Sequence, residues 1–196
     1  MRGLQSGIMS SEVMIAENVL PCDECAQLTA IYNRYWAHAR TAHPDWAPVV
    51  LDYYTLRELN PVAATHMYRT VLECRRKIES ELRTPELFIE HMLLACLSPG
   101  ESHIDHADNE KEENGQWVPN HTPQRDFTTL LYLNGDFIGG ELVFRDRGLR
   151  ITPKAGLLVG FPCTREFVHG VPAVQSGKRY SLPVWYTLDQ TRAMRL

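Results

Sequence analysis

The sequence predicts a single α+β domain over residues 1–196, with a helical front part over about 1–86 and a β-rich part over about 87–190. In the front part, apolar residues recur at spacings of three and four, whereas short strand-like runs alternate with turn residues after residue 86. Many short strands at regular spacing are typical of a sandwich or a barrel. A chain of 196 residues can bury such a core without disulfide or metal staples.

Two helices are expected in the front part, where they would cover one outer face of the β-rich part. The first spans about 25–40, and the second follows Asn60-Pro61, an N-cap residue before a proline suited to the first helical position, and runs to about Arg83. Cys22 and Cys25 should lie in the first turn of the first helix, with a dithiol redox role as the minor alternative. Strands are also expected over 13–20 and 48–56.

Seven strands are expected in the β-rich part. Between the second and the third lies a polar connection, residues 109–125, which shows no periodic pattern and has the length of a functional lid or a disordered loop. The seven expected strands span 87–97, 102–108, 127–133, 141–144, 156–161, 166–174 and 179–188.

The composition argues against nucleic acid and membranes as partners. With 20 basic and 24 acidic residues, the formal net charge of -4 offers no basic surface for nucleic acid or an anionic membrane. There is no run of about 18 apolar residues that could span a bilayer. The five cysteines are an odd and scattered set, which favours a reducing compartment. We therefore expect a cytoplasmic protein without nucleic-acid or membrane partners, and the oligomeric state stays open.

The stretch HIDHADNE, residues 103–110, contains the pattern His-x-Asp twice. On a regular strand His103 and Asp105 face one side, while Ile104, His106 and Asp108 face the other. Because an apolar residue should mark the inward face, we predict that His106 and Asp108 point inward. A cupin-like cluster of His103, His106 and Glu110 is the alternative, but histidines three residues apart on a regular strand face opposite sides.

A third metal ligand is expected further along the chain, where His169 lies in an apolar strand and is followed by a glycine. Two imidazoles and one carboxylate with open positions form the facial arrangement of non-haem Fe(II) oxygenases. Ten residues later, Arg179 and Ser181 share a strand face. A buried guanidinium needs an anion, and its planar fork matches a carboxylate such as the distal one of 2-oxoglutarate.

Five stretches in order resemble a known family over roughly half of the chain. The sequence from about residue 87 to 189 is similar to the 2-oxoglutarate- and Fe(II)-dependent dioxygenases of the prolyl hydroxylase type, and especially to leprecan-like prolyl 3-hydroxylases. The stretches are SPGESHIDHADN, RDFTTLLYLNGDFIGGELVF, ITPKAGLLVGF, HGVPAV and GKRYSLPVWYTLD. The resemblance implies a double-stranded β-helix, which is a jelly-roll barrel, and it selects the same pair of ligands because the Pro99-Gly100 turn precedes His106 at the family's spacing.

The resemblance also implies roles for individual residues. Fe(II) would bind His106, Asp108 and His169, and the C5 carboxylate of 2-oxoglutarate would bind Arg179 and the hydroxyl of Tyr132. Further positions are Thr128 and Ser181 as weaker candidates for the cosubstrate pocket, Arg125 as a substrate contact, and Leu97, where many relatives carry a tyrosine.

The implied reaction uses O₂ and 2-oxoglutarate, with ascorbate as an auxiliary reductant, and releases succinate and CO₂. We expect hydroxylation of an unactivated C–H in a prolyl or amino-acid-type substrate. The alternatives are hydroxylation, desaturation or cyclisation of a small-molecule natural-product intermediate, and a non-catalytic metal-binding barrel. A free amino acid, a peptide and a small molecule all stay open as substrates.

Overall fold

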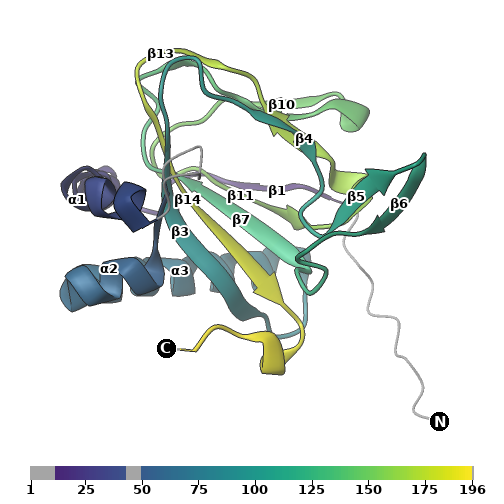
Figure 1. Cartoon of the computed structure of the whole chain (residues 1–196), viewed down its shortest axis with the longest axis horizontal. Helices are drawn as coiled ribbons and strands as arrows, with labels where there is room; N and C mark the ends of the chain where they lie inside the picture. Colours follow the sequence, from purple (N-terminus) through teal and green to yellow (C-terminus); the bar gives the residue numbers. More distant parts are fainter. Residues whose placement is uncertain (1–11, 43–49, 196) are drawn as a thin grey trace.

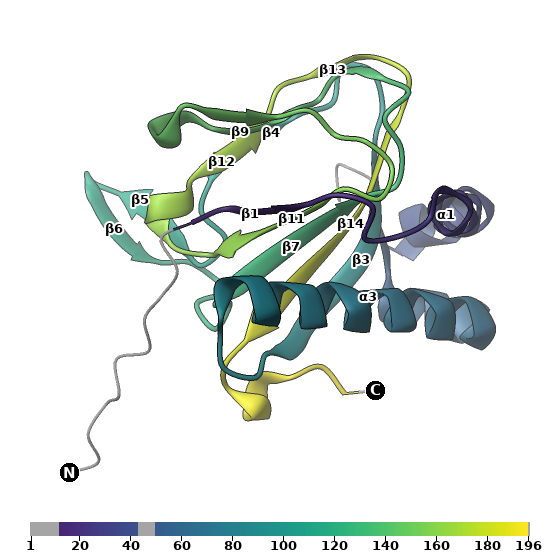
Figure 2. The ribbon, with the colours of Figure 1, turned by 180° about the vertical axis from the view of Figure 1, so that it is seen from behind.

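Two antiparallel sheets face each other in the computed structural model, which describes residues 12–42 and 50–195 (Figures 1 and 2). The six-stranded sheet has the order β1-β11-β7-β14-β3-β2 and the four-stranded sheet the order β10-β9-β12-β4. The larger sheet is built from β1 (Met14–Ala16), β2 (Val50–Asp52), β3 (Phe88–Leu97), β7 (Phe127–Tyr132), β11 (Leu158–Pro162) and β14 (Arg179–Thr187). The smaller sheet is built from β4 (His103–His106), β9 (Leu142–Phe144), β10 (Leu149–Ile151) and β12 (His169–Val171).

The remaining strands form two small two-stranded sheets. One pairs β8 (Ile138–Gly139) with β13 (Val174–Ser176), and the other pairs β5 (Glu110–Glu113) with β6 (Gln116–Pro119). The expected strand over 166–174 is divided, since a 3-10 turn, Arg165–Phe167, precedes β12.

The helices lie against the face of the six-stranded sheet that points away from the smaller sheet (Figure 2). They are α1 (Cys22–Ala42), α2 (Tyr53–Leu59) and α3 (Pro61–Leu82). In α3 the Asn60 side chain accepts hydrogen bonds from the N–H groups of Val62 and Ala63, as its position before Pro61 predicts. Cys22 and Cys25 lie in the first turn of α1, with free thiols.

One expectation for the connecting segments is wrong. Over 48–56 only Val50–Asp52 is a strand, because the Asp52 carboxylate accepts from the N–H groups of Tyr54 and Thr55 and so caps α2, while residues 48 and 49 lie outside the described residues. The connection 109–125 contains the β5–β6 hairpin (Figure 1). Its turn is Asn114-Gly115, with φ of 54° and 75°, a dipeptide suited to a two-residue hairpin turn.

The six-stranded sheet separates two apolar cores. On β3, Met92 and Leu94 are buried against the helices, whereas Leu97 belongs to the core between the sheets, as the two-residue period of a strand requires. The core between the sheets also contains Phe144 and Phe161, whose rings meet edge to face at 4.9 Å. A functional cavity can therefore lie between the sheets while the helices support it from behind. In the described part of the chain, none of the helices is long and apolar enough to cross a membrane.

Candidate active site

The pairing of β4 with β12 brings together the predicted metal ligands. His106 lies opposite His169 in the register of these strands, and their ring centroids are 4.5 Å apart. Asp108 follows β4 and is buried. One ligand atom from each of the three residues lies within 4.8 Å of the others, and among the described residues this is the one such group of histidine, cysteine or acidic side chains. The arrangement can hold a metal ion through two imidazoles and one carboxylate.

A β-bulge overturns two expectations for β4. His169 is opposite His106 but Val171 is opposite His103, so three steps on β4 match two steps on β12. The extra residue reverses the alternation, and as a result Ile104 is 83% exposed and His103 lines the same cavity as His106. The predicted inward position of Ile104 and the predicted opposite-face position of His103 are both wrong. His103 nevertheless lies outside the three-ligand group.

The expectation for Asp105 agrees with the structure. Its carboxylate lies on the outer side of the smaller sheet and pairs with Arg145. Gly170 on β12 passes so close that a β-carbon there would overlap this carboxylate. The glycine after His169 is therefore required by close packing against β4.

Backbone carbonyl groups orient both imidazoles. His106 Nδ1 lies 2.8 Å from the carbonyl oxygen of Ile104, and His169 Nδ1 lies 3.0 Å from that of Phe167. A hydrogen on Nδ1 satisfies each contact, which leaves Nε2 with its lone pair available for a metal. Local carbonyls thus select the ring nitrogen that faces the cluster.

Asp108 is held at its side chain and at its backbone. The Thr128 hydroxyl donates to Oδ2 at 2.7 Å, while Oδ1 lies 3.7 Å from His106 Nε2. The Asp108 N–H donates to the Cys163 carbonyl oxygen at 3.1 Å. Its own carbonyl oxygen accepts from the Asn120 amide at 3.1 Å and the Thr122 hydroxyl at 2.9 Å. The segment after β6 therefore helps to fix the carboxylate.

The electrostatics of the cluster suit a cation. Burial by itself would raise the pKa of Asp108, but the adjacent His106 imidazole, the charge of His169 and the hydrogen bond from the Thr128 hydroxyl lower it well below its usual value. Burial would lower the pKa of His106, and its contacts with Asp108 reverse this and raise it. The pKa of His169 is lowered, chiefly by burial. An ionised carboxylate thus sits beside a site that favours positive charge.

Arg179 occupies another part of the same cavity and is only 3% exposed. Its Nε donates to the Gly140 carbonyl oxygen at 2.9 Å, Nη2 to the Tyr132 hydroxyl at 3.2 Å and Nη1 to the Ser181 hydroxyl at 3.4 Å. In the described part of the chain, no carboxylate forms an ion pair with it. A buried guanidinium held only by neutral groups is a binding site for an anion.

The cavity between these charged groups has a volume of about 140 Å³ and a mainly apolar wall. Residues of one parity on β14 line it, because alternate side chains of that strand point between the sheets. Leu97 is among the apolar residues of this wall, which are Val50, Leu93, Ala95, Leu97, Leu130, Val171, Pro183 and Trp185.

The weaker candidates for the cosubstrate and substrate sites make different contacts in the structure. Thr128 and Ser181 both line the cavity, but the Thr128 hydroxyl bonds Asp108 whereas that of Ser181 bonds Arg179. Arg125 is absent from the cavity lining. Its Nε lies 2.9 Å from Glu90 Oε2, and its guanidinium lies 4.1 Å from the ring centroid of Trp185. Trp185 lines the cavity, so Arg125 contacts a residue of the cavity wall.

Two residues near the site were not predicted. Trp185 could have been found, because it shares parity with Arg179 and Ser181 on the same strand. Cys163, whose thiol lies 3.1 Å from the Thr128 hydroxyl, carried no such signal, since its position depends on the pairing of β11 with β7.

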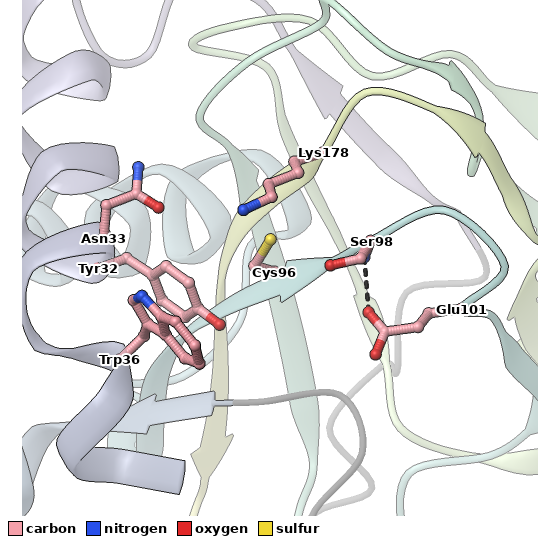
Figure 3. Close-up of a pocket in the computed structure, with 7 residues that line it drawn as sticks. All are labelled: Tyr32, Asn33, Trp36, Cys96, Ser98, Glu101 and Lys178. Atoms are coloured by element: carbon pink, nitrogen blue, oxygen red, sulfur yellow. Dashed lines mark hydrogen bonds between the residues drawn. The ribbon is translucent and has the colours of Figure 1, made fainter.

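A second cavity, of about 160 Å³, lies on the helix side of the six-stranded sheet (Figure 3). Cys96 and Lys178 point into it, although their chain neighbours Leu97 and Arg179 line the cavity between the sheets. Tyr32 and Trp36 of α1 form its aromatic wall (Figure 3). This cavity contains none of the three clustered metal-ligand candidates, so the candidate active site is the one between the sheets.

Comparisons with known proteins agree with this geometry. Residues 92–187 match the family model of the 2OG-Fe(II) oxygenase superfamily. Prolyl 3-hydroxylase 1 of Rattus norvegicus is 30% identical over 218 residues, which cover 94% of this chain and 30% of that protein. The chain therefore spans less than a third of the length of this curated relative.

Two solved structures share the fold. One is the viral collagen prolyl hydroxylase of Paramecium Bursaria Chlorella virus-1 in its 2OG complex, with a TM-score of 0.66 at 17% identity, covering 98% of this chain and 100% of that chain. The other is a prolyl hydroxylase from Trichoplax adhaerens in complex with a hypoxia inducible factor oxygen degradation domain peptide fragment. Its TM-score is 0.65 at 20% identity, covering 92% of this chain and 84% of that chain.

The matched family uses Fe(II), 2-oxoglutarate and O₂, and the donor set of His106, Asp108 and His169 fits iron. On the sequence matches and the fold together, the chain belongs to the 2OG-Fe(II) oxygenase superfamily, and the relatives that it resembles are prolyl hydroxylases.

Proposed function

We propose that this chain hydroxylates an unactivated C–H of a prolyl or amino-acid-type substrate, with conversion of 2-oxoglutarate and O₂ to succinate and CO₂. One observation carries the proposal. The cluster of two histidines and a carboxylate faces a mainly apolar cavity. A buried guanidinium, which has no acidic partner among the described residues, faces the same cavity. The metal and the dicarboxylate that the reaction requires thus each have a complementary group in the same cavity: the ligand cluster for the metal and the guanidinium for the dicarboxylate.

In this proposal His106, Asp108 and His169 bind Fe(II), and Arg179 binds the distal carboxylate of 2-oxoglutarate with help from the hydroxyls of Tyr132 and Ser181. The Arg179 fork is already oriented by the Gly140 carbonyl, so little side-chain freedom is lost on binding. Bound iron and 2-oxoglutarate supply the oxidising chemistry. The protein orients the substrate C–H and excludes water.

The apolar wall supports a substrate with an apolar reacting part. Leu93, Leu130, Pro183 and Trp185 offer hydrocarbon and aromatic surface to a pyrrolidine ring and would exclude bulk water from the reaction. Arg125, which stacks on Trp185, is proposed to act on the substrate side through that ring.

A prolyl residue in a peptide is the substrate we favour. The name of the rat relative and the peptide complex of the Trichoplax adhaerens enzyme support this class. A small-molecule natural-product intermediate is the alternative, since one ring would occupy a cavity of about 140 Å³. A non-catalytic barrel is disfavoured by the complete donor set.

We further propose that the β-rich part is a double-stranded β-helix within a single domain, which the two facing antiparallel sheets and the fold of the solved relatives support. A cytoplasmic, reducing location is supported by the five unpaired cysteines.

The test is an assay of succinate formation from 2-oxoglutarate with Fe(II) and ascorbate, combined with mass spectrometry of prolyl peptides and free amino acids. We expect turnover that depends on Fe(II), and a gain of one oxygen on a prolyl peptide. Oxygen gained only by free amino acids or small molecules would replace the peptide proposal. Absence of both turnover and Fe(II) binding would overturn the enzymatic function.

A further inference from the structure

The Thr128 hydroxyl lies between the carboxylate of Asp108 and the thiol of Cys163, at 2.7 Å from Asp108 Oδ2 and 3.1 Å from Cys163 Sγ. All three side chains are buried. We propose that Thr128, supported by Cys163, is a positioning residue that restricts Asp108 to metal coordination through Oδ1 alone. This inference rests on the proposed function, because it concerns the metal site.

The hydrogens available to the three groups determine the direction of both bonds. An ionised carboxylate only accepts, so the single hydroxyl hydrogen of Thr128 must point to Asp108 Oδ2. The Thr128 oxygen is then free to accept the S–H of Cys163. The Cys163 thiol is buried beside this hydroxyl, at 3.1 Å, and can supply that hydrogen. The network therefore runs from Cys163 through Thr128 to Asp108.

The two oxygens of Asp108 have different surroundings as a result. Oδ1 lies on the side of His106 Nε2, at 3.7 Å, and Oδ2 is engaged by Thr128. A hydrogen-bonded oxygen is a weaker and less mobile metal ligand, so Oδ1 is the one offered to the ion. Together with two imidazoles, a single carboxylate oxygen would leave coordination positions of a bound iron open for the cosubstrate and O₂. Binding through both oxygens would remove one of those open positions.

Backbone pairing prevents this network from reorienting. Thr128 on β7 is opposite Phe161 on β11, and Cys163 follows that strand. The Cys163 N–H donates to the Asp126 carbonyl at 2.9 Å, and its carbonyl oxygen accepts from the Asp108 N–H at 3.1 Å. The thiol, the hydroxyl and the carboxylate are thus carried by segments that hydrogen-bond to one another.

The variants Thr128→Val and Thr128→Ser test the role of the hydroxyl. Metal-free protein is titrated anaerobically with Fe(II) in the presence of 2-oxoglutarate, and the visible charge-transfer absorption of the chelated iron is recorded. We expect Thr128→Val to lose about 10- to 100-fold in Fe(II) affinity, the usual effect of removing a group that orients a metal ligand, and to change that absorption. Thr128→Ser keeps the hydroxyl and should stay close to wild type.

Thr129→Val is the matched control. Thr129 is the next residue on β7, is equally buried, and its hydroxyl lies 3.0 Å from that of Tyr186 on the helix side of the sheet. It should lose stability without changing the affinity for Fe(II) or the absorption. Cys163→Ala is a second test that leaves the hydroxyl in place, and we expect a smaller loss of affinity than in Thr128→Val.

Each result decides between outcomes. Unchanged affinity and absorption in Thr128→Val, or an equal loss in Thr129→Val, would overturn the inference. Should Thr128→Val fail to fold, Cys163→Ala decides, since an unchanged affinity and absorption there would contradict the network. If the wild-type protein bound no Fe(II), the proposed function itself would fail. If the wild type and all variants bound Fe(II) equally well, only this inference would fail.

Discussion

His106 on β4 lies directly opposite His169 on β12, with 4.5 Å between the centroids of their rings, although 62 residues separate them in the chain (169 minus 106, less one). A single pair of antiparallel strands thus assembles both imidazole ligands. Asp108 reaches the same place because it follows β4 by two residues. The site depends on this pairing more than on any loop.

Substitution of His106 and His103 separates a metal ligand from a neighbour in the same cavity. His106→Ala should abolish stoichiometric Fe(II) binding, because two ligands remain of three. His103→Ala should retain it, since His103 lies outside the three-ligand group although its ring centroid is 6.4 Å from that of His106. Metal content after anaerobic loading measures both. Loss of iron in His103→Ala alone would reverse the assignment.

Replacement of Arg179 should weaken the binding of 2-oxoglutarate. Removing one partner of a buried charge pair costs about 2–5 kcal/mol, so Arg179→Ala should raise the Kd accordingly. Arg179→Lys should also bind poorly, because an ammonium lacks the planar fork. Lys178→Ala is the control, as Lys178 points to the other face of the sheet (Figure 3). Calorimetric titration with 2-oxoglutarate in the presence of the redox-inert ion Zn²⁺ gives the values. Equal affinities in Arg179→Ala and Lys178→Ala would contradict the assignment.

Gly170 should not tolerate a side chain while Asp105 is present. A β-carbon at residue 170 would overlap the Asp105 carboxylate, so Gly170→Ala should lose about 1–3 kcal/mol in the free energy of unfolding. Asp105→Ala removes the obstacle, and the double variant should be more stable than the sum of the single effects predicts. Urea denaturation of the four proteins measures this coupling. Simple additivity would show that the close approach is not the cause.

The metal-free protein should lose stability as the pH falls from about 6.5 to about 4, in part because of His103. Burial, with the charges of His106 and other neighbours, lowers the pKa of His103 from 6.5 to about 4. In this window the unfolded chain binds the proton and the folded chain does not, so stability rises with pH and the contribution is complete above the unfolded pKa.

His103→Asn tests this contribution, since asparagine does not titrate. The urea midpoint of this variant, measured in chelator across the same window, should depend less steeply on pH than that of wild type. His106, whose pKa is raised, acts in the opposite direction in both proteins. Equal slopes would contradict the role of His103.

Local patterns in the sequence determined α1, α3, most strands and the candidate residues of the site. The Asn60-Pro61 signal placed the start of α3 because capping is a local interaction. The choice of His106, Asp108, His169 and Arg179 needed only residue chemistry, spacing and resemblance to a family. The Asn114-Gly115 hairpin was also readable, but its polar strands lack the apolar alternation that marks a half-buried strand.

Only the tertiary structure decided which way the side chains of β4 point. Parity assumes a regular ladder, and the bulge opposite Gly170 is set by a partner strand far away in the sequence, which turns His103 into the cavity and Ile104 out to solvent. The same holds for Thr128, whose partner is Asp108 because β7 and β11 place its hydroxyl there. Residue chemistry and spacing thus nominate ligands locally, whereas strand pairing between distant segments decides which groups orient them.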